Sequence, residues 1–151
     1  MGLKIFTVTM ALGLAACTGS PAILASQPDF EVLTGAGLAS VGIRQSPPGI
    51  TDTEYAEWVK AAMERAAPGS VVTGPAEQPF PSRRIVWHVD PTASRGMSRL
   101  VVNVFNGSIP YAYVQQVVAN SAPRAVTSSA IESMSKQLLA AIAAQANTRP
   151  S

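Results

Sequence analysis

The sequence is poor in cysteine, histidine and charged residues. One cysteine among 151 residues cannot form a disulfide within the chain. With one histidine besides, the chain lacks the three or four Cys and His ligands that zinc and copper sites usually use. Charged residues make up 13% and apolar residues 47%, a composition typical of a packed domain rather than a disordered chain. We therefore expect a folded protein with no metal and no other cofactor.

There is also no strong excess of charge of either sign. Eleven Lys and Arg against nine Asp and Glu give a net charge of +2. Loss of an N-terminal leader containing Lys4 would leave ten basic and nine acidic residues, a net charge of +1. Nucleic-acid binding needs several phosphate-neutralising cations in one patch. The composition predicts no nucleic-acid partner.

The apolar run at the N-terminus is too short to cross a membrane. It extends from Ile5 to Leu14 and is broken only by Thr7, Thr9 and Gly13, whereas a spanning helix needs ~20 apolar residues. Lys4 supplies a positive charge just before it. A basic residue followed by a short apolar run is typical of an export signal peptide.

This run ends in Leu14-Ala15-Ala16-Cys17, which contains the only cysteine. The tetrapeptide resembles the lipobox of bacterial lipoproteins, in which a leucine and two small residues precede a cysteine that takes a lipid. The resemblance implies a signal peptide at residues 1–16 and a triacylated, palmitate-bearing Cys17 as the first mature residue. Two or more acyl chains give stable membrane anchoring. The alternatives are a plain secretory signal or an uncleaved short anchor, with Cys17 incidental.

The residue after Cys17 bears on location. In Gram-negative lipoproteins an Asp at that position favours retention in the inner membrane, and Thr18 stands there instead. For a Gram-negative source, the resemblance implies the periplasmic leaflet of the outer membrane. Residues 17–40 are low in charge and contain several Gly and Pro, so we predict a flexible lipid-anchored tether. A periplasmic domain at 41–146 and a frayed tail at 147–151 complete the predicted organisation.

Two stretches of this domain have helical periodicity. Thr51-Asp52-Thr53-Glu54 fits a capping box that opens the first helix, and Pro68-Gly69 ends it. The second helix is expected to start between residues 122 and 129. The apolar stripes are Tyr55, Trp58, Val59, Ala62, Met63 and Ala66 in the first helix, and Ile131, Met134, Leu138, Ala141 and Ile142 in the second. Each stripe predicts one buried helix face.

Between the helices, residues 84–90, 100–105 and 111–118 have the pattern of β-strands. Short connections join them, and Asn106-Gly107 marks a turn that we expect to extend through Pro110. Residues 41–44 are a candidate first strand at the edge. We predict an α+β two-layer fold in the order (β)αβββα. Its antiparallel sheet has three to four strands, with both helices on one face.

The predicted order and the closing helix are similar to those of auxiliary lipoproteins of envelope ABC-type transporters. The similarity covers about a third of the chain and includes the serine- and alanine-rich helix that contains Ser129 to Leu139. It favours an accessory role in the envelope, by analogy of fold alone.

His88 and Asp90 are the candidate catalytic residues. They stand two residues apart on one face of a predicted strand, which suits an acid–base pair. No Gly-x-Ser-x-Gly motif marks a nucleophile for a triad. The pair is therefore open to two interpretations, a surface histidine beside a carboxylate or the acid–base pair of a small periplasmic enzyme.

The candidate partner-binding residues fall into two groups. Tyr55 and Trp58 on the first helix suit either core packing or the edge of a partner groove. Four arginines flank the first predicted hairpin, and if they converge they would bind anionic lipid headgroups, lipopolysaccharide or an acidic partner. These are Arg83, Arg84, Arg95 and Arg99.

These observations predict a non-enzymatic, lipid-anchored accessory or binding protein of the bacterial cell envelope. We expect Cys17 to hold it to the membrane and an envelope protein to be its partner. The alternatives are a small periplasmic enzyme that uses His88 and Asp90, and a structural lipoprotein that contacts the cell wall.

Overall fold

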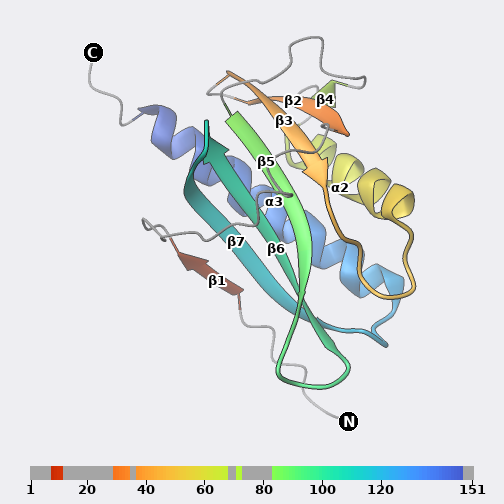
Figure 1. Cartoon of the computed structure of the whole chain (residues 1–151). Coiled ribbons are helices and arrows are strands. Elements are labelled where there is room, and N and C mark those ends of the chain that lie inside the picture. The colour runs from red at the N-terminus through yellow and green to blue at the C-terminus, as the bar shows by residue number, and fades with distance from the viewer. Residues whose placement is uncertain (1–7, 12–28, 35–36, 68–70, 73–82, 148–151) are drawn as a thin grey trace.

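A computed structural model describes residues 8–11, 29–34, 37–67, 71–72 and 83–147 (Figure 1). The elements in chain order are β1 (Val8–Ala11), β2 (Phe30–Thr34), β3 (Gly37–Ile43), α2 (Asp52–Ala66), β4 (Val71–Val72), β5 (Arg83–Pro91), β6 (Met97–Asn106), β7 (Ile109–Ala119) and α3 (Arg124–Asn147).

The strands form one mixed sheet in the order β1-β7-β6-β5-β3-β2-β4. Five strands, β7-β6-β5-β3-β2, make its body, and β1 and β4 are short edge strands of four and two residues. The predicted α+β class is confirmed. The predicted antiparallel sheet of three to four strands is wrong, because the body has five strands and β3 pairs with β5 in parallel.

The parallel pair follows from the position of α2 in the chain. Parallel neighbours need a long crossover connection, usually a helix, and α2 lies between β3 and β5. The candidate strand at 41–44 falls mostly within β3, which begins earlier and lies inside the sheet between β2 and β5. The predicted tether is corrected at its end, since residues 30–34 and 37–40 belong to β2 and β3.

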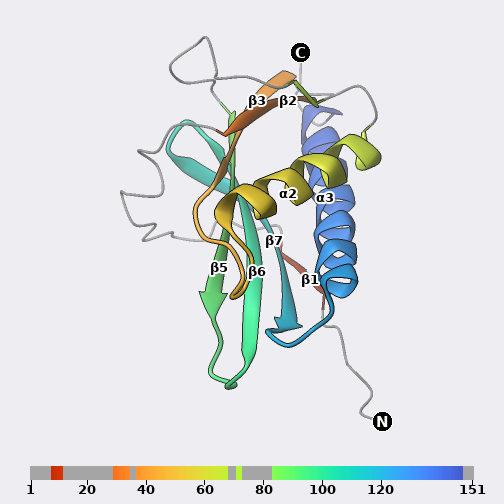
Figure 2. The ribbon, with the colours of Figure 1, turned by 90° about the vertical axis from the view of Figure 1, so that its right-hand side faces the viewer.

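Both helices pack on the same face of the sheet, as predicted (Figure 2). Alternate residues of each strand point to this face and meet the buried stripes of α2 and α3. The sheet residues of the core are Phe30, Val32, Ala39, Val41, Ile43, Ile85, Trp87, Val89, Leu100, Val102, Val104, Ala112, Val114 and Val118. This packed interface holds the domain together, since burying each large apolar side chain contributes ~1.5–3 kcal/mol.

α2 begins as its sequence predicts. The Thr51 hydroxyl oxygen accepts a hydrogen bond from the Glu54 amide at 3.2 Å, which is the N-cap contact of a capping box. The predicted stripe is confirmed at Tyr55, Val59 and Met63, which are fully buried. The cap therefore fixes where the helix starts, and the stripe fixes which side faces the sheet.

α3 begins at Arg124, directly after Pro123, and runs through Ser129 without a break. A proline suits this position because it has no amide hydrogen to leave unpaired in the first turn. All five predicted stripe residues are buried, and Gln145 is exposed, so the buried face ends near Ile142 as expected.

The antiparallel meander of β5, β6 and β7 is confirmed. The β6–β7 turn is shorter than predicted, because Asn106 already pairs with Ile109. Gly107 in this turn has φ +62°, a conformation that glycine adopts without strain. Pro110 lies within β7, next to the register shift between Val104 and Phe105, where a missing amide hydrogen costs least.

Candidate functional sites

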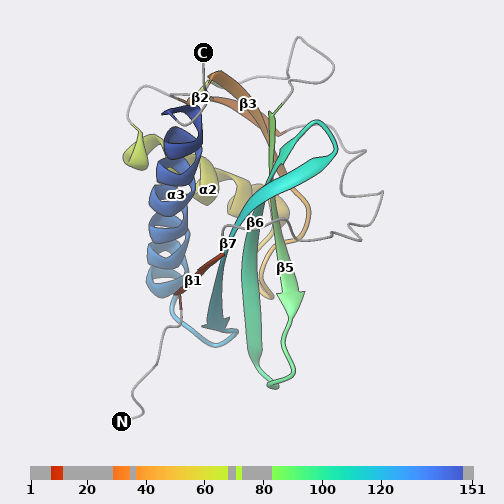
Figure 3. The same cartoon turned by 90° about the vertical axis from the view of Figure 1, so that its left-hand side faces the viewer.

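The face of the sheet opposite the helices is called the second face (Figure 3). Most of the polar candidate residues lie on it. Strand alternation sends one residue in two to this side. Its members on the meander are Arg84, Val86, His88 and Asp90 on β5, Arg99, Val101, Asn103 and Phe105 on β6, and Tyr113, Gln115 and Val117 on β7.

The structure brings His88 and Asp90 together, as the sequence spacing indicates. His88 Nε2 lies 3.4 Å from Asp90 Oδ1, and His88 Nδ1 lies 3.5 Å from Asn103 Nδ2. An imidazole that accepts at Nδ1 from the Asn103 amide, with Nε2 facing the Asp90 carboxylate, fits these contacts. The His88 side chain is 14% exposed and that of Asp90 is 47% exposed. The ring is thus held in place, with its carboxylate partner open to solvent.

This arrangement does not include a nucleophile. Among the described residues, the hydrogen bonds and ion pairs of His88 go to Asn103 and Asp90, and none goes to a Ser, Thr or Cys side chain. A triad needs a nucleophile within hydrogen-bonding distance of the base. The geometry therefore suits a structural histidine or an acid–base pair, and does not assemble a hydrolytic triad.

The four arginines do not form one patch. In the strand register, Arg83 and Arg84 stand opposite Asn106 and Phe105 at one end of the β5–β6 hairpin, and Arg99 stands opposite Asp90 at the other end. Arg95 lies in the turn between the two strands, at the same end as Arg99. Seven residues of strand separate the two ends, which is about 23 Å.

Arg83 and Arg84 also point to opposite faces of the sheet. The Arg84 guanidinium donates a hydrogen bond to the Gly107 carbonyl oxygen. Burial raises the pKa of Tyr111, and the nearby Arg83 guanidinium partly offsets that increase. Arg83 and Arg84 thus have different neighbours and do not form a joint binding surface.

Tyr55 and Trp58 occupy different environments on α2. Tyr55 is fully buried, and its ring meets the Trp87 ring edge to face, with centroids 6.5 Å apart and planes at 86°. Burial raises the pKa of its hydroxyl. Trp58 is partly buried and packs against the core. Only Trp58 of the two has exposed surface to offer a partner.

Several buried polar atoms have no hydrogen-bond partner within the part of the chain that the structure describes. They include the Tyr55 hydroxyl, Trp87 Nε1, Ser135 Oγ and Gln116 Oε1. Tyr55 and Trp87 are large core residues whose polar atoms come with their rings. Gln116 differs because it lies on β7 among core valines, and no sequence pattern marked it as unusual.

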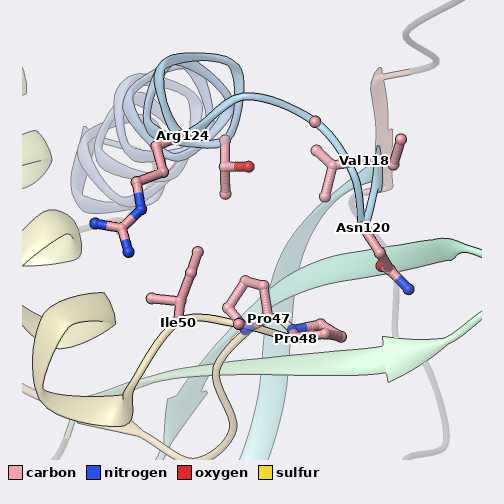
Figure 4. Close-up of a pocket in the computed structure, with 10 residues that line it drawn as sticks. Pro47, Pro48, Ile50, Val118, Asn120 and Arg124 are labelled. Carbon is pink, nitrogen blue, oxygen red and sulfur yellow. The ribbon is translucent and has the colours of Figure 1, made fainter.

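A small pocket opens where the start of α2 approaches the start of α3 (Figure 4). Its volume is about 210 Å³, and its lining includes Pro47, Ile50, Val118 and Asn120. Arg124 at its rim binds the Glu54 carboxylate at 2.6 Å. Ligand clefts are usually ~300–1,000 Å³, so this pocket is below the usual size.

The described ranges contain no group of three or more His, Cys, Asp and Glu placed to hold a metal. Within the same ranges, neither helix combines the length and the apolar character that crossing a membrane requires. Cys17, the predicted lipid-attachment residue, lies outside the described residues, as do residues 18–28 of the predicted tether.

Comparison with known proteins places the chain in no family. No family model matches it, and no curated protein matches it. Among solved structures, the chain is similar to a dodecamer of a PelC variant from Paraburkholderia phytofirmans, with 10% sequence identity and a TM-score of 0.45 over 91% of this chain and 97% of that one. A likeness at this level supports no conclusion about function.

Proposed function

We propose that this protein is a lipid-anchored accessory or binding protein of the bacterial cell envelope, without enzymatic activity. The observation that carries the proposal is Leu14-Ala15-Ala16-Cys17 at the end of a short apolar run. Its chemistry is specific, because a thiol is needed to take the lipid and small residues before it give the peptidase access to the bond. Cys17 is thus the functional residue, and residues 1–16 are the signal peptide.

The composition of the domain supports this proposal. The core is built from apolar side chains and needs no disulfide. A free thiol in an oxidising compartment is open to oxidation and to mixed disulfides. Acylation of Cys17 removes that thiol, which accounts for a single cysteine in an exported chain.

The residue after Cys17 indicates which membrane holds the protein. Thr18 stands where an inner-membrane lipoprotein would carry Asp. In a Gram-negative cell the lipid therefore anchors the domain in the periplasmic leaflet of the outer membrane. The domain then contacts an envelope partner, for which Trp58 and the second face of the sheet are the available surfaces.

The experiment expresses the full chain in a Gram-negative host with labelled palmitate and compares it with Cys17→Ser. The wild type should carry the label and fractionate with membranes, and Cys17→Ser should lose both. Ser20→Ala, a hydroxyl substitution just beyond the lipobox, is the matched control and should behave as wild type. Unchanged fractionation and labelling of Cys17→Ser would overturn the proposal.

A second candidate function is a small periplasmic enzyme, and the contact between His88 and Asp90 favours it. The two candidates differ in what they predict for His88→Gln in a strain that depends on the protein, because this change keeps a hydrogen-bonding side chain on the second face and removes the acid–base group. The enzyme loses its function in this variant although the fold is intact. The accessory protein retains its function, and circular dichroism establishes that the variant is folded.

A further inference from the structure

The edge of the sheet next to β7 is covered by a segment that processing would remove. β1 pairs with β7 in antiparallel register, from Val8 opposite Gln116 to Ala11 opposite Tyr113 (Figures 1 and 3). β1 lies within residues 1–16, the signal peptide of the proposed function. Cleavage before Cys17 would therefore leave β7 as the edge of the sheet.

β7 has little of the protection that edge strands usually carry. Natural edges are blunted by short strands, by charged side chains, or by proline. β7 has eleven residues and no charged side chain, and its one proline stands near its start. At the opposite edge β4 has only two residues, and its neighbour β2 carries Glu31. β7 is thus a long edge without charge.

Gln116 adds a second observation on the same strand. Its side chain is only 6% exposed, and its Oε1 atom has no hydrogen-bond partner in the described structure. A buried acceptor without a partner destabilises the fold. Gln116 is the residue opposite Val8, so the cost falls where β1 covers the sheet.

We propose that, after signal cleavage, β7 pairs in antiparallel fashion with β7 of a second copy of the chain. β1 shows what the edge accepts, an uncharged extended segment that lies antiparallel. β7 is itself such a strand, and it is already ordered, so pairing fixes little additional chain.

The symmetry and the anchor favour this occupant. An antiparallel β7–β7 pair places no like charges opposite each other, and it is a closed two-fold interface in which both copies use the same surface. Two copies on one membrane also meet at a raised effective concentration. This step rests on the proposed lipid anchor.

The test places single cysteines along β7 in the full chain, at Tyr113→Cys, Gln115→Cys and Val117→Cys. Membranes are treated with a short thiol crosslinker, because residues opposite each other across antiparallel strands have Cβ atoms ~4.5–5.5 Å apart. At least one position should give a band at twice the mass of the processed protein. Glu64→Cys, on the exposed side of α2, is the matched control and should stay monomeric.

Two unanchored proteins that carry the same reporters test the role of β1, namely Cys17→Ser with its signal attached and the same protein without residues 1–16. β1 covers the edge only in the first, so the crosslinked dimer should form only in the second. Val117→Lys in the processed chain places a charge on the edge and should convert a dimer into a monomer in detergent sedimentation.

The outcomes separate this inference from the proposed function. A lipidated, cleaved protein that gives no dimer overturns the inference and leaves the anchor standing. A crosslink from β7 to a different protein overturns the claim that a second copy of the chain pairs with this edge. A protein that retains residues 1–16 in the wild-type chain overturns the anchor, and the inference falls with it.

Discussion

The two faces of the sheet are made by the same strands and differ in what they carry. On the helix side, β5 presents Ile85, Trp87 and Val89, all buried in the core. On the second face the same strand presents Arg84, His88 and Asp90, which are partly exposed. One face therefore carries the stability of the domain, and the other carries the candidate chemistry and contact surface.

The difference is not one of simple exposure. Val86, Val101 and Phe105 on the second face are also buried, at 3%, 7% and 4% relative exposure. They stand outside the core cluster that the helices cover. The second face thus mixes buried apolar residues with polar ones, whereas the helix face is almost wholly apolar. Substitutions on the two faces should have separable effects.

The largest effect is expected for Trp87→Ala. Trp87 is fully buried on the helix face, and removing a large aromatic side chain from a core typically costs ~3–5 kcal/mol. His88→Ala, the next residue on the other face, should cost less, ~1–2 kcal/mol, because it removes a smaller ring that keeps 14% of its surface exposed and makes only two long polar contacts. Urea unfolding of both variants measures the contrast. Equal losses at the two positions would contradict the division between the faces.

Two substitutions at Tyr55 distinguish the contribution of its ring to stability from that of its hydroxyl. Tyr55→Ala should lose ~3–5 kcal/mol with the buried ring. Tyr55→Phe keeps the contact with Trp87 and removes a hydroxyl that has no partner among the described residues, so its stability at pH 7 should be unchanged or up to ~1 kcal/mol higher.

The same pair of variants predicts a response to alkali. Burial raises the pKa of Tyr55 above its usual value of 10.0, so its contribution to stability is fully present below pH 10 and is lost as the pH rises above it. Tyr55→Phe should lose less stability than wild type above pH 10. If wild type and Tyr55→Phe lose the same amount of stability as the pH rises above 10, the result would count against a buried hydroxyl.

A smaller loss of stability is expected for Gly42→Ala, on the second face at β3. A Cβ atom on Gly42 would lie 2.9 Å from Arg44 Cζ, so the guanidinium must move away from its position over the strand. Arg44 lies 3.7 Å from the Asp29 carboxylate, and the loss of such a pair typically costs ~1 kcal/mol or less. Gly42→Ala should therefore destabilise by that amount in thermal unfolding.

A double variant shows whether the effect comes from Arg44. In an Arg44→Ala background the added methyl group meets no guanidinium, so Gly42→Ala should have little further effect. A full loss in both backgrounds would place the cause in the backbone of β3.

The smallest effect is expected between the helices. Glu132 on α3 binds Arg65 of α2 at 3.0 Å and Lys136 at 3.1 Å. The hydrogen bonds from Lys136 and Arg65 lower the pKa of Glu132 below its usual 4.5. Its contribution is therefore present well above pH 4.5 and is lost as the pH falls through the lowered value.

Glu132→Gln should have a slightly lower Tm than wild type at pH 7, and the difference should vanish in acid and shrink in high salt. Glu57→Gln, on an exposed side of α2, is the control and should show no such pattern. A difference between wild type and Glu132→Gln that persists at low pH would exclude the ion pairs as its source.

The helices and the meander were predictable because their signals are local. The capping contact of Thr51 and the stripe from Ile131 to Ile142 depend on spacing along a single helix. The contact between His88 and Asp90 was predictable for the same reason, since strand alternation places both on one face.

The β2–β3 hairpin and the parallel pairing were not predictable from such patterns. The stretch from residue 30 to 43 is interrupted by glycines and low in charge, so it resembles a linker. Its strands depend on pairing, because β3 pairs with β5 far along the chain and β2 pairs with β3. The burial of Gln116 was missed for a similar reason. A single polar residue in a strand has no signature until its neighbours in space are known.

The most direct test of the lipid anchor is the mass of the N-terminal peptide of the protein extracted from membranes. We predict a peptide that begins at Cys17 and carries the added mass of a diacylglyceryl group and an N-linked acyl chain. A peptide that begins elsewhere, or a Cys17 with a free thiol, would contradict the account.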